Sequence, residues 1–136
     1  MKKGKRVKPK FPIEYRLLIT QRWNEHKKAT VTLVGLRTVI EFRNFLYEIV
    51  VEPMLDDRTL HLKIHGLRAP QVTIPGTGPA KFSTAFSELE GSYTVIVTKP
   101  NGEENTYGVH IAKGQVVVEQ RPRKTFTDIV TKEEEW

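Results

Sequence analysis

The stretch SYTVIVTKPNGEENTYGVHIAK, residues 92–113, is the part of the sequence that decides the fold class. Residues 93–98 and 106–111 each place aromatic or β-branched side chains at alternate positions. Pro100-Asn101-Gly102, which separates these two runs, is a turn sequence. Alternation with a period of two residues is typical of strands with one buried face. We therefore predict a β-hairpin over this stretch.

The same alternation continues on the N-terminal and C-terminal sides of this hairpin. Residues 13–23 and 30–36 predict a second hairpin, whose polar connection Asn24–Lys28 is longer than the two-residue minimum. Leu60–His65 is the most regular of the predicted half-buried strands. Shorter strands are predicted at residues 72–74, 81–86, 116–118 and 126–130. Because Pro and Gly punctuate the region around 72–74 and 81–86, we expect these two strands at sheet edges.

The segment Thr38–Val51 allows two interpretations. Its apolar residues also recur at helical spacing, and Thr38 with Glu41 matches a capping box. Alternation from Phe45 onward, with many β-branched and aromatic residues, favours a strand that ends before Pro53. We predict a strand over Phe45–Glu52 and leave a preceding helical turn open.

Successive hairpins with little helix favour an all-β fold. We expect an antiparallel β-sandwich with the N-terminal hairpin as an addition, and a closed antiparallel β-barrel, able to hold a small apolar ligand, is the alternative. The length of 136 residues suits one domain. We place this domain at residues 13–130, between a flexible basic arm at 1–12 and an acidic, solvated tail at 131–136.

The run Glu90-Gly91-Ser92-Tyr93-Thr94-Val95 resembles the tyrosine corner that precedes strand F of immunoglobulin-like sandwiches. The resemblance implies that the Tyr93 hydroxyl bonds back to nearby backbone and that residues 93–111 form the F–G hairpin. It also implies adhesion, ligand recognition or spacing as the kind of function, although a fold does not determine a function. The disulfide of antibody domains is not expected, because Val95 stands at the cysteine position.

Net charge is the feature that points most directly to a partner. The chain carries +6, and the six basic residues of the arm account for the excess, because the remaining 16 basic residues equal the 16 acidic ones. Such an arm can contact phosphates or anionic lipid by counterion release, and a second basic cluster near residue 122 adds to it. The candidate anion-binding residues are Lys2, Lys3, Lys5, Arg6, Lys8, Lys10, Arg121, Arg123 and Lys124.

Several classes of protein are disfavoured by what the sequence lacks. It contains no cysteine, which excludes disulfides, zinc–thiolate sites and cysteine nucleophiles. Residues 1–14 have no apolar stretch of the kind found in signal peptides, and no uncharged apolar run approaches the ~20 residues that span a bilayer. We expect a soluble protein, with the cytoplasm as the favoured location.

No catalytic or metal site is predicted. His61 and His65 share one strand face, but four residues at about 3.3 Å each separate them too widely to bind one ion, so a zinc site would need His110 and a carboxylate as well. The three serines, Ser83, Ser87 and Ser92, lie in no nucleophile motif. Two pairs of adjacent acids and one glycine-rich segment are explained by turns and loops: Asp56, Asp57, Glu103, Glu104 and Gly76–Pro79.

Two functional hypotheses follow. The first is a non-catalytic interaction module without a cofactor, in which a loop such as Leu67–Gly78 or an exposed strand edge contacts another protein. The second is an anion-binding or nucleic-acid-binding protein that uses the basic arm.

Overall fold

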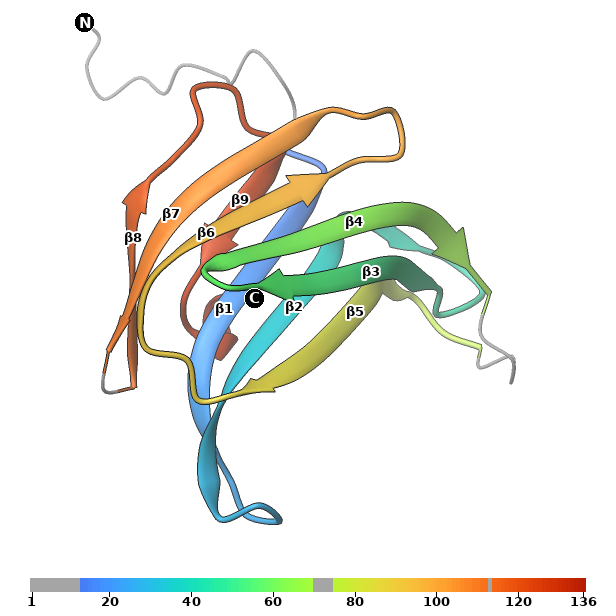
Figure 1. Ribbon diagram of the computed structural model, residues 1–136. Helices are drawn as coiled ribbons and strands as arrows, with labels where there is room; N and C mark the ends of the chain where they lie inside the picture. The colour runs from blue at the N-terminus through green and yellow to red at the C-terminus, as the bar shows by residue number, and fades with distance from the viewer. Residues whose placement is uncertain (1–12, 70–74, 113) are drawn as a thin grey trace, which may run out of the picture.

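Strands form where the sequence alternates, and they make up nearly all of the regular structure (Figure 1). The computed structural model describes residues 13–69, 75–112 and 114–136. The elements are β1 (Tyr15–Asn24), β2 (Ala29–Phe42), β3 (Glu48–Asp56), β4 (Thr59–Arg68), β5 (Gly78–Ser87), β6 (Gly91–Thr98), β7 (Glu104–Ala112), β8 (Gln115–Gln120), β9 (Thr127–Val130) and the 3₁₀ helix η1 (Glu133–Glu135). The prediction of an all-β fold is confirmed. The expected strand at 72–74 lies outside the described residues.

Residues 38–51, all of them described, contain no α-helix. β2 continues to Phe42, with a shift of register against β5 between Arg37 and Glu41, and β3 begins at Glu48. Pro53 lies inside β3 instead of ending it. A proline cannot donate to a neighbouring strand. This position tolerates it because, among the described residues, no strand pairs with β3 at Pro53 on the side away from β4.

The nine strands form one mixed sheet in the order β8-β7-β6-β4-β3-β5-β2-β1-β9. The pairs β1–β9, β3–β5 and β4–β6 are parallel, so the expectation of a wholly antiparallel sheet is wrong. The physical reason is that alternation reports which side chains are buried, whereas the direction of a neighbour depends on where the chain crosses over. Between β4 and β6 the chain leaves to form β5 against β2.

The sheet curls into a half-barrel in which β1, β2 and β5 lie behind β3, β4, β6 and β7 (Figure 1). A common core fills the space between these two halves, with Leu17, Leu36, Leu62 and Val97 fully buried in it. One bridge pair, Glu48 with Lys81, connects the halves between β3 and β5. Two separate sheets of a sandwich are therefore not confirmed, and the barrel alternative fits in part because the sheet curls without closing.

Residues 131–136, which we call the C-terminal strap, lie against the outer face of β1 and β2. Glu133 forms an ion pair with Arg22 at 2.9 Å, and the indole Nε1 of Trp136 donates to the main-chain oxygen of Arg16 at 3.1 Å. We expected these residues as a solvated tail; their acidic side chains are exposed, but Trp136 anchors them to the domain.

Candidate interaction surfaces

The most open part of the sheet is the outer edge of β5. Lys81 is the last β5 residue that pairs with β3, and from Phe82 to Ser87 the described residues supply no strand on that side. The inner edge of the same stretch is fully paired with β2, from Val31 opposite Ser87 to Leu36 opposite Phe82. Along this six-residue stretch, the N–H and C=O groups of alternate residues, which point away from β2, are therefore available to a further strand.

Side chains along this edge suit a strand neighbour. Phe82, Thr84 and Phe86 point inward and are half-buried, and both phenylalanines pack against the hydrophobic core. The alternate residues Ser83, Ala85 and Ser87 are exposed. Within the edge there is no charged residue after Lys81 and no proline, which are the usual devices that keep a strand edge from pairing.

The prediction that β5 is an edge strand agrees with the structure only in part. We predicted this segment as an edge strand, and the structure places it between β3 and β2. Beyond the single bridge at Lys81, most of its outer side nevertheless has no neighbouring strand in the described part of the chain. Local sequence indicated the strand itself, but the divergence of β3 from β5 depends on the curl of the whole sheet.

The facing edge of β3 is less suited to pairing. Pro53 removes one donor, and Glu52 and Asp56 bring negative charge to the exposed part of the strand. Met54 and Leu55 are 57% and 38% exposed, so this rim is apolar as well as charged.

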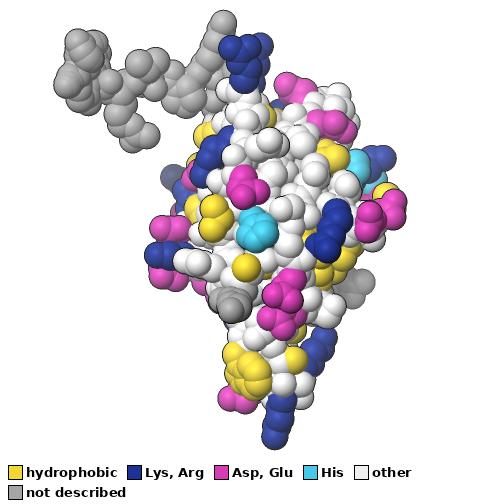
Figure 2. All heavy atoms as spheres, turned by 60° about the vertical axis from the view of Figure 1, so that its left-hand side comes forward, with side chains coloured by type: hydrophobic (Ala, Val, Ile, Leu, Met, Phe, Trp, Pro, Cys, Tyr) yellow, Lys and Arg dark blue, Asp and Glu magenta, His cyan; other side chains and the backbone are white. Residues whose placement is uncertain are grey.

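The candidate anion-binding residues fall into two groups. Lys2, Lys3, Lys5, Arg6, Lys8 and Lys10 lie outside the described residues. Arg121, Arg123 and Lys124 are exposed on the connection between β8 and β9. On the face shown in Figure 2, basic and acidic side chains are interspersed, without a large patch of one sign among the described residues.

A buried side chain forms hydrogen bonds with the connection between β8 and β9, which carries Arg121, Arg123 and Lys124. Asn105, which is 1% exposed, donates from Nδ2 to the main-chain oxygen of Lys124 at 2.9 Å. Its Oδ1 accepts from the backbone N–H groups of Phe126 and Thr127 at 2.9 and 3.2 Å. This part of the basic cluster is therefore displayed on a fixed segment.

The histidines have separate partners and do not converge. His61 Nε2 lies 2.7 Å from the Thr98 hydroxyl, and His65 Nε2 lies 3.0 Å from Glu52 Oε1. His110 Nδ1 lies 3.2 Å from the Ser92 hydroxyl. Within the described ranges, no group of three or more His, Asp or Glu side chains is arranged to hold a metal ion.

The pair Ser92 and His110 was not predicted, because the two residues are on different strands and meet only through the register of β6 with β7. Ser92 is exposed and His110 half-buried, and a surface hollow of about 320 Å³ lies beside Ser92, lined also by Arg58 and Glu119. Within the described chain, no acidic side chain forms a hydrogen bond or ion pair with this histidine. We interpret the pair as a cross-strand contact on a solvent-facing surface.

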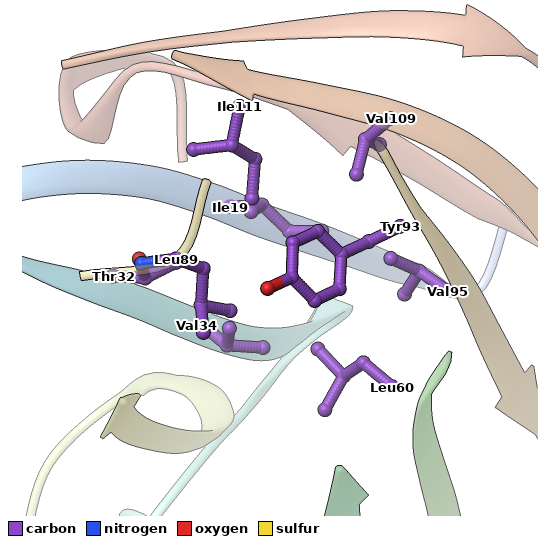
Figure 3. A pocket seen from close by; sticks show the side chains of 9 residues that line it. All are labelled: Ile19, Thr32, Val34, Leu60, Leu89, Tyr93, Val95, Val109 and Ile111. Atoms are coloured by element: carbon purple, nitrogen blue, oxygen red, sulfur yellow. The ribbon is translucent and has the colours of Figure 1, made fainter. Parts of the chain in front are cut away.

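Tyr93 does not form the expected tyrosine corner. Its ring points into a cavity of about 10 Å³ between the two halves of the sheet, where Val34, Leu60 and Leu89 surround it (Figure 3). Among the described residues, no hydrogen bond to its hydroxyl is found. A space of this size holds about one water molecule, so this cavity is too small for the apolar ligand that the barrel alternative allowed.

The Tyr93 ring instead makes a cation–π contact with Arg58. The guanidinium carbon lies 5.0 Å from the ring centroid, and Nη1 donates to the main-chain oxygen of Glu90. Gly91, between Glu90 and Tyr93 in the sequence, has a φ of +103°. A Cβ on Gly91 would be 2.7 Å from Arg58 Nη1. The glycine before the tyrosine, noted in the sequence, therefore makes room for an arginine.

No protein-family model, curated protein or solved structure matches this chain. No helix among the described residues is long and apolar enough to cross a membrane.

Proposed function

We propose that this protein is a non-catalytic interaction module that accepts an extended segment of a partner protein as an additional strand on the outer edge of β5. The observation that carries the proposal is the end of the β3–β5 ladder at Lys81, after which no described strand lies along the outer side of Phe82–Ser87. Strand addition supplies affinity through main-chain hydrogen bonds and specificity through alternate side chains.

The side chains of β5 indicate the chemistry of the partner segment. Its inward residues would meet Phe82, Thr84 and Phe86, so apolar or aromatic residues at alternate positions fit best. Its outward residues would lie beside Ser83 and Ala85, where small or polar side chains are accommodated. A partner of about six residues matches the length of the open edge.

A peptide-display selection tests the proposal. Random seven-residue peptides are selected on the parent protein, and binding of the winners is measured by fluorescence anisotropy. The double substitution Ser83→Lys, Ala85→Lys places two charges on exposed edge positions and should weaken binding at least tenfold without unfolding the domain. Thr106→Lys is the matched control, because Thr106 is an exposed strand residue on β7, away from this edge.

Two results would contradict strand addition. One is a set of selected peptides that bind the double variant as tightly as the parent. The other is a selection whose winners lose binding equally with Thr106→Lys. Selected sequences without alternating apolar residues would overturn the proposed partner chemistry.

We also propose that the two halves of the curled sheet act as the facing layers of an immunoglobulin-like sandwich. Support comes from the common core, to which both the β1–β2 half and the β4–β6–β7 half contribute buried residues. In this arrangement loops and edges are the expected contact regions.

Anion binding is the second candidate. Its support is the rigid display of Arg121 and Arg123, whose connection Asn105 holds through the main chain of Lys124. Binding of a single-stranded oligonucleotide is measured across a salt series for the parent, for a chain lacking residues 2–10, and for Arg121→Ala, Arg123→Ala. A salt slope that neither change reduces rules this candidate out.

A further inference from the structure

Three basic residues lie side by side across the outer face of β1, β2 and β5. The register places Arg16 opposite Arg37 and Arg37 opposite Lys81. Like charges in directly opposed cross-strand positions repel one another. The row has one acid, Asp128 on β9, whose Oδ2 lies 3.7 Å from Arg16 Nε. An electron-rich group above such a row would reduce this repulsion.

Trp136 of the C-terminal strap supplies that group. Its main-chain oxygen accepts from Arg37 Nη1 at 2.8 Å and from Arg16 Nη1 at 3.4 Å. Its indole ring lies with its centroid 5.8 Å from Lys81 Nζ. Each guanidinium thus gives one hydrogen bond to the same oxygen, and charged donors of this kind also bind carboxylate and phosphate oxygens strongly.

Gly35 forms the floor beneath the indole. It is opposite Leu18 on β1 and Ser83 on β5, in the row next to the three cations. A Cβ at this position would be 2.8 Å from Trp136 Cζ2, closer than atoms can approach. The missing side chain therefore makes a notch that fits a flat ring.

Arg22 extends the basic surface along β1, where it pairs with Glu133 of the strap. We call the surface made by Arg16, Arg22, Gly35, Arg37 and Lys81 the strap groove. Arg16 Nε is buried and, among the described residues, forms only the 3.7 Å ion pair with Asp128 and no hydrogen bond.

The strap covers this groove without contributing to the core. None of the residues of η1 is buried, and no strap residue belongs to the hydrophobic cluster between the two halves of the sheet. Its attachment consists of one ion pair, hydrogen bonds to and from Trp136 and one cation–ring contact. Release of the strap would therefore expose the basic row and the notch at Gly35, next to the buried Leu18, and leave the hydrophobic cluster between the two halves intact.

We propose that the strap groove is a binding site for a short acidic, tryptophan-bearing segment of another polypeptide, and that residues 131–136 are its intramolecular ligand. The chemistry of the occupant supports a peptide partner: a carboxylate pairs with Arg22, a main-chain oxygen with Arg37 and an indole N–H with the Arg16 carbonyl. The groove is on the outer face of the sheet, and its use does not depend on strand addition at the β5 edge.

The test uses the full chain carrying Trp136→Ala, so that the resident ligand loses its ring and the groove is partly open. The probe is a dye-labelled synthetic peptide with the sequence of residues 131–136, and binding is followed by fluorescence anisotropy. The peptide should bind the variant at least tenfold more tightly than the parent chain, because in the parent the tethered strap competes at an effective concentration on the order of 1 mM.

Additional variants in the Trp136→Ala background locate the binding. Gly35→Val fills the notch and Arg37→Ala removes the principal donor, so each should abolish measurable binding. Arg43→Ala is the matched control, since Arg43 is an exposed arginine on the segment after β2 and takes part in none of the hydrogen bonds or ion pairs of the described strap. A peptide with its tryptophan replaced by alanine should not bind.

Each contrary outcome overturns the proposal. Absence of peptide binding at millimolar concentration, or binding that survives Gly35→Val, shows that the groove is not a peptide site. Loss of the folded state in the Trp136→Ala chain, followed by circular dichroism, shows that the strap is structural. Tighter binding of a single-stranded oligonucleotide than of the peptide assigns the groove to nucleic acid instead.

Discussion

The hydroxyl of Tyr107 donates a hydrogen bond to the main-chain oxygen of Thr127 at 2.9 Å, and it also contacts the Thr127 hydroxyl. Tyr107 is 1% exposed and Thr127 2% exposed, so this contact ties β7 to β9 in the interior. A buried phenol requires such a partner, because an unpaired hydroxyl in an apolar environment is costly. Tyr107 thus has the hydroxyl-to-backbone bond that the sequence resemblance assigned to Tyr93.

Substitution of the two tyrosines by phenylalanine should change the free energy of unfolding by different amounts. Tyr107→Phe removes the bond to Thr127 and leaves a buried acceptor, so we expect a loss of about 1–2 kcal/mol in the free energy of unfolding. Tyr93→Phe removes a hydroxyl that points into the small cavity, so the change should be within about 0.5 kcal/mol of zero or stabilising. Urea unfolding measures both, and an equal loss for the two variants would contradict the assignment.

Asn105 should be among the most sensitive polar positions. Its Oδ1 accepts three hydrogen bonds, from Phe126 N, Thr127 N and the Thr127 hydroxyl. Asn105→Ala leaves these donors without a partner in a buried site, and we expect a loss of about 2–4 kcal/mol. Asn101→Ala, in an exposed turn on the same hairpin, is the control and should cost less than about 1 kcal/mol. Thermal and urea unfolding would show whether the two differ.

A comparison of alanine substitutions at Gly91 and Gly102 separates the stability cost of backbone strain from that of side-chain crowding. Their φ angles are +103° and +93°, but a Cβ at Gly102 meets nothing within 4 Å, whereas one at Gly91 meets Arg58. Both alanine variants should lose about 1–2 kcal/mol from strain, and Gly91→Ala about 1 kcal/mol more because the guanidinium must leave the Glu90 oxygen. In an Arg58→Ala background the difference should vanish; if it persists, crowding by Arg58 is not the cause.

Lys99 should make stability fall at alkaline pH. Its hydrogen bond with Glu14 at 2.6 Å raises the pKa of Lys99, and a second pairing, with Glu103, acts in the same direction. The folded protein therefore keeps this proton at a pH where the unfolded chain, with a lysine pKa near 10.4, has lost it. The stabilisation is complete below about pH 10 and disappears as pH rises through the folded pKa.

Lys99→Met tests this dependence. The side chain is only 12% exposed and also lies 4.9 Å from the Phe126 ring centroid, so its loss should cost about 1–2 kcal/mol at pH 8. Urea unfolding between pH 8 and pH 11 should show a shallower decline for the variant than for the parent. Parallel curves would mean that Lys99 contributes nothing to the pH dependence.

Much of the strand pattern could be predicted from local sequence. The hairpin of β6 and β7 and that of β1 and β2 are confirmed, because each has strongly alternating residues and a clear turn between them. Local sequence could not predict the parallel pairs, since Leu60 and Val95 meet only after the chain has formed β5 elsewhere.

The candidate surfaces were less accessible to sequence reasoning. Arg16, Arg37 and Lys81 are far apart along the chain, and only the register of three strands makes them neighbours. Gly35 looks like an ordinary strand glycine until Trp136 is placed against it. Trp136 itself follows three glutamates, whose charge suggested a solvated tail. Composition and hydrophobic periodicity describe one segment at a time. The row of cations and the contact of Trp136 with Gly35 depend on how distant segments pack together.

The parallel pairing of β9 with β1 has a consequence for the biosynthesis of this protein. Tyr15 is paired with Thr127 and Leu18 with Val130, so β1 meets this neighbour only after the seven strands between them, β2 to β8, have been made. The β1–β2 hairpin has local contacts and can form early, whereas closure of its other side is non-local and therefore slow. Until then β1 presents an unprotected edge to other nascent chains, and chaperone binding is expected to be concentrated there.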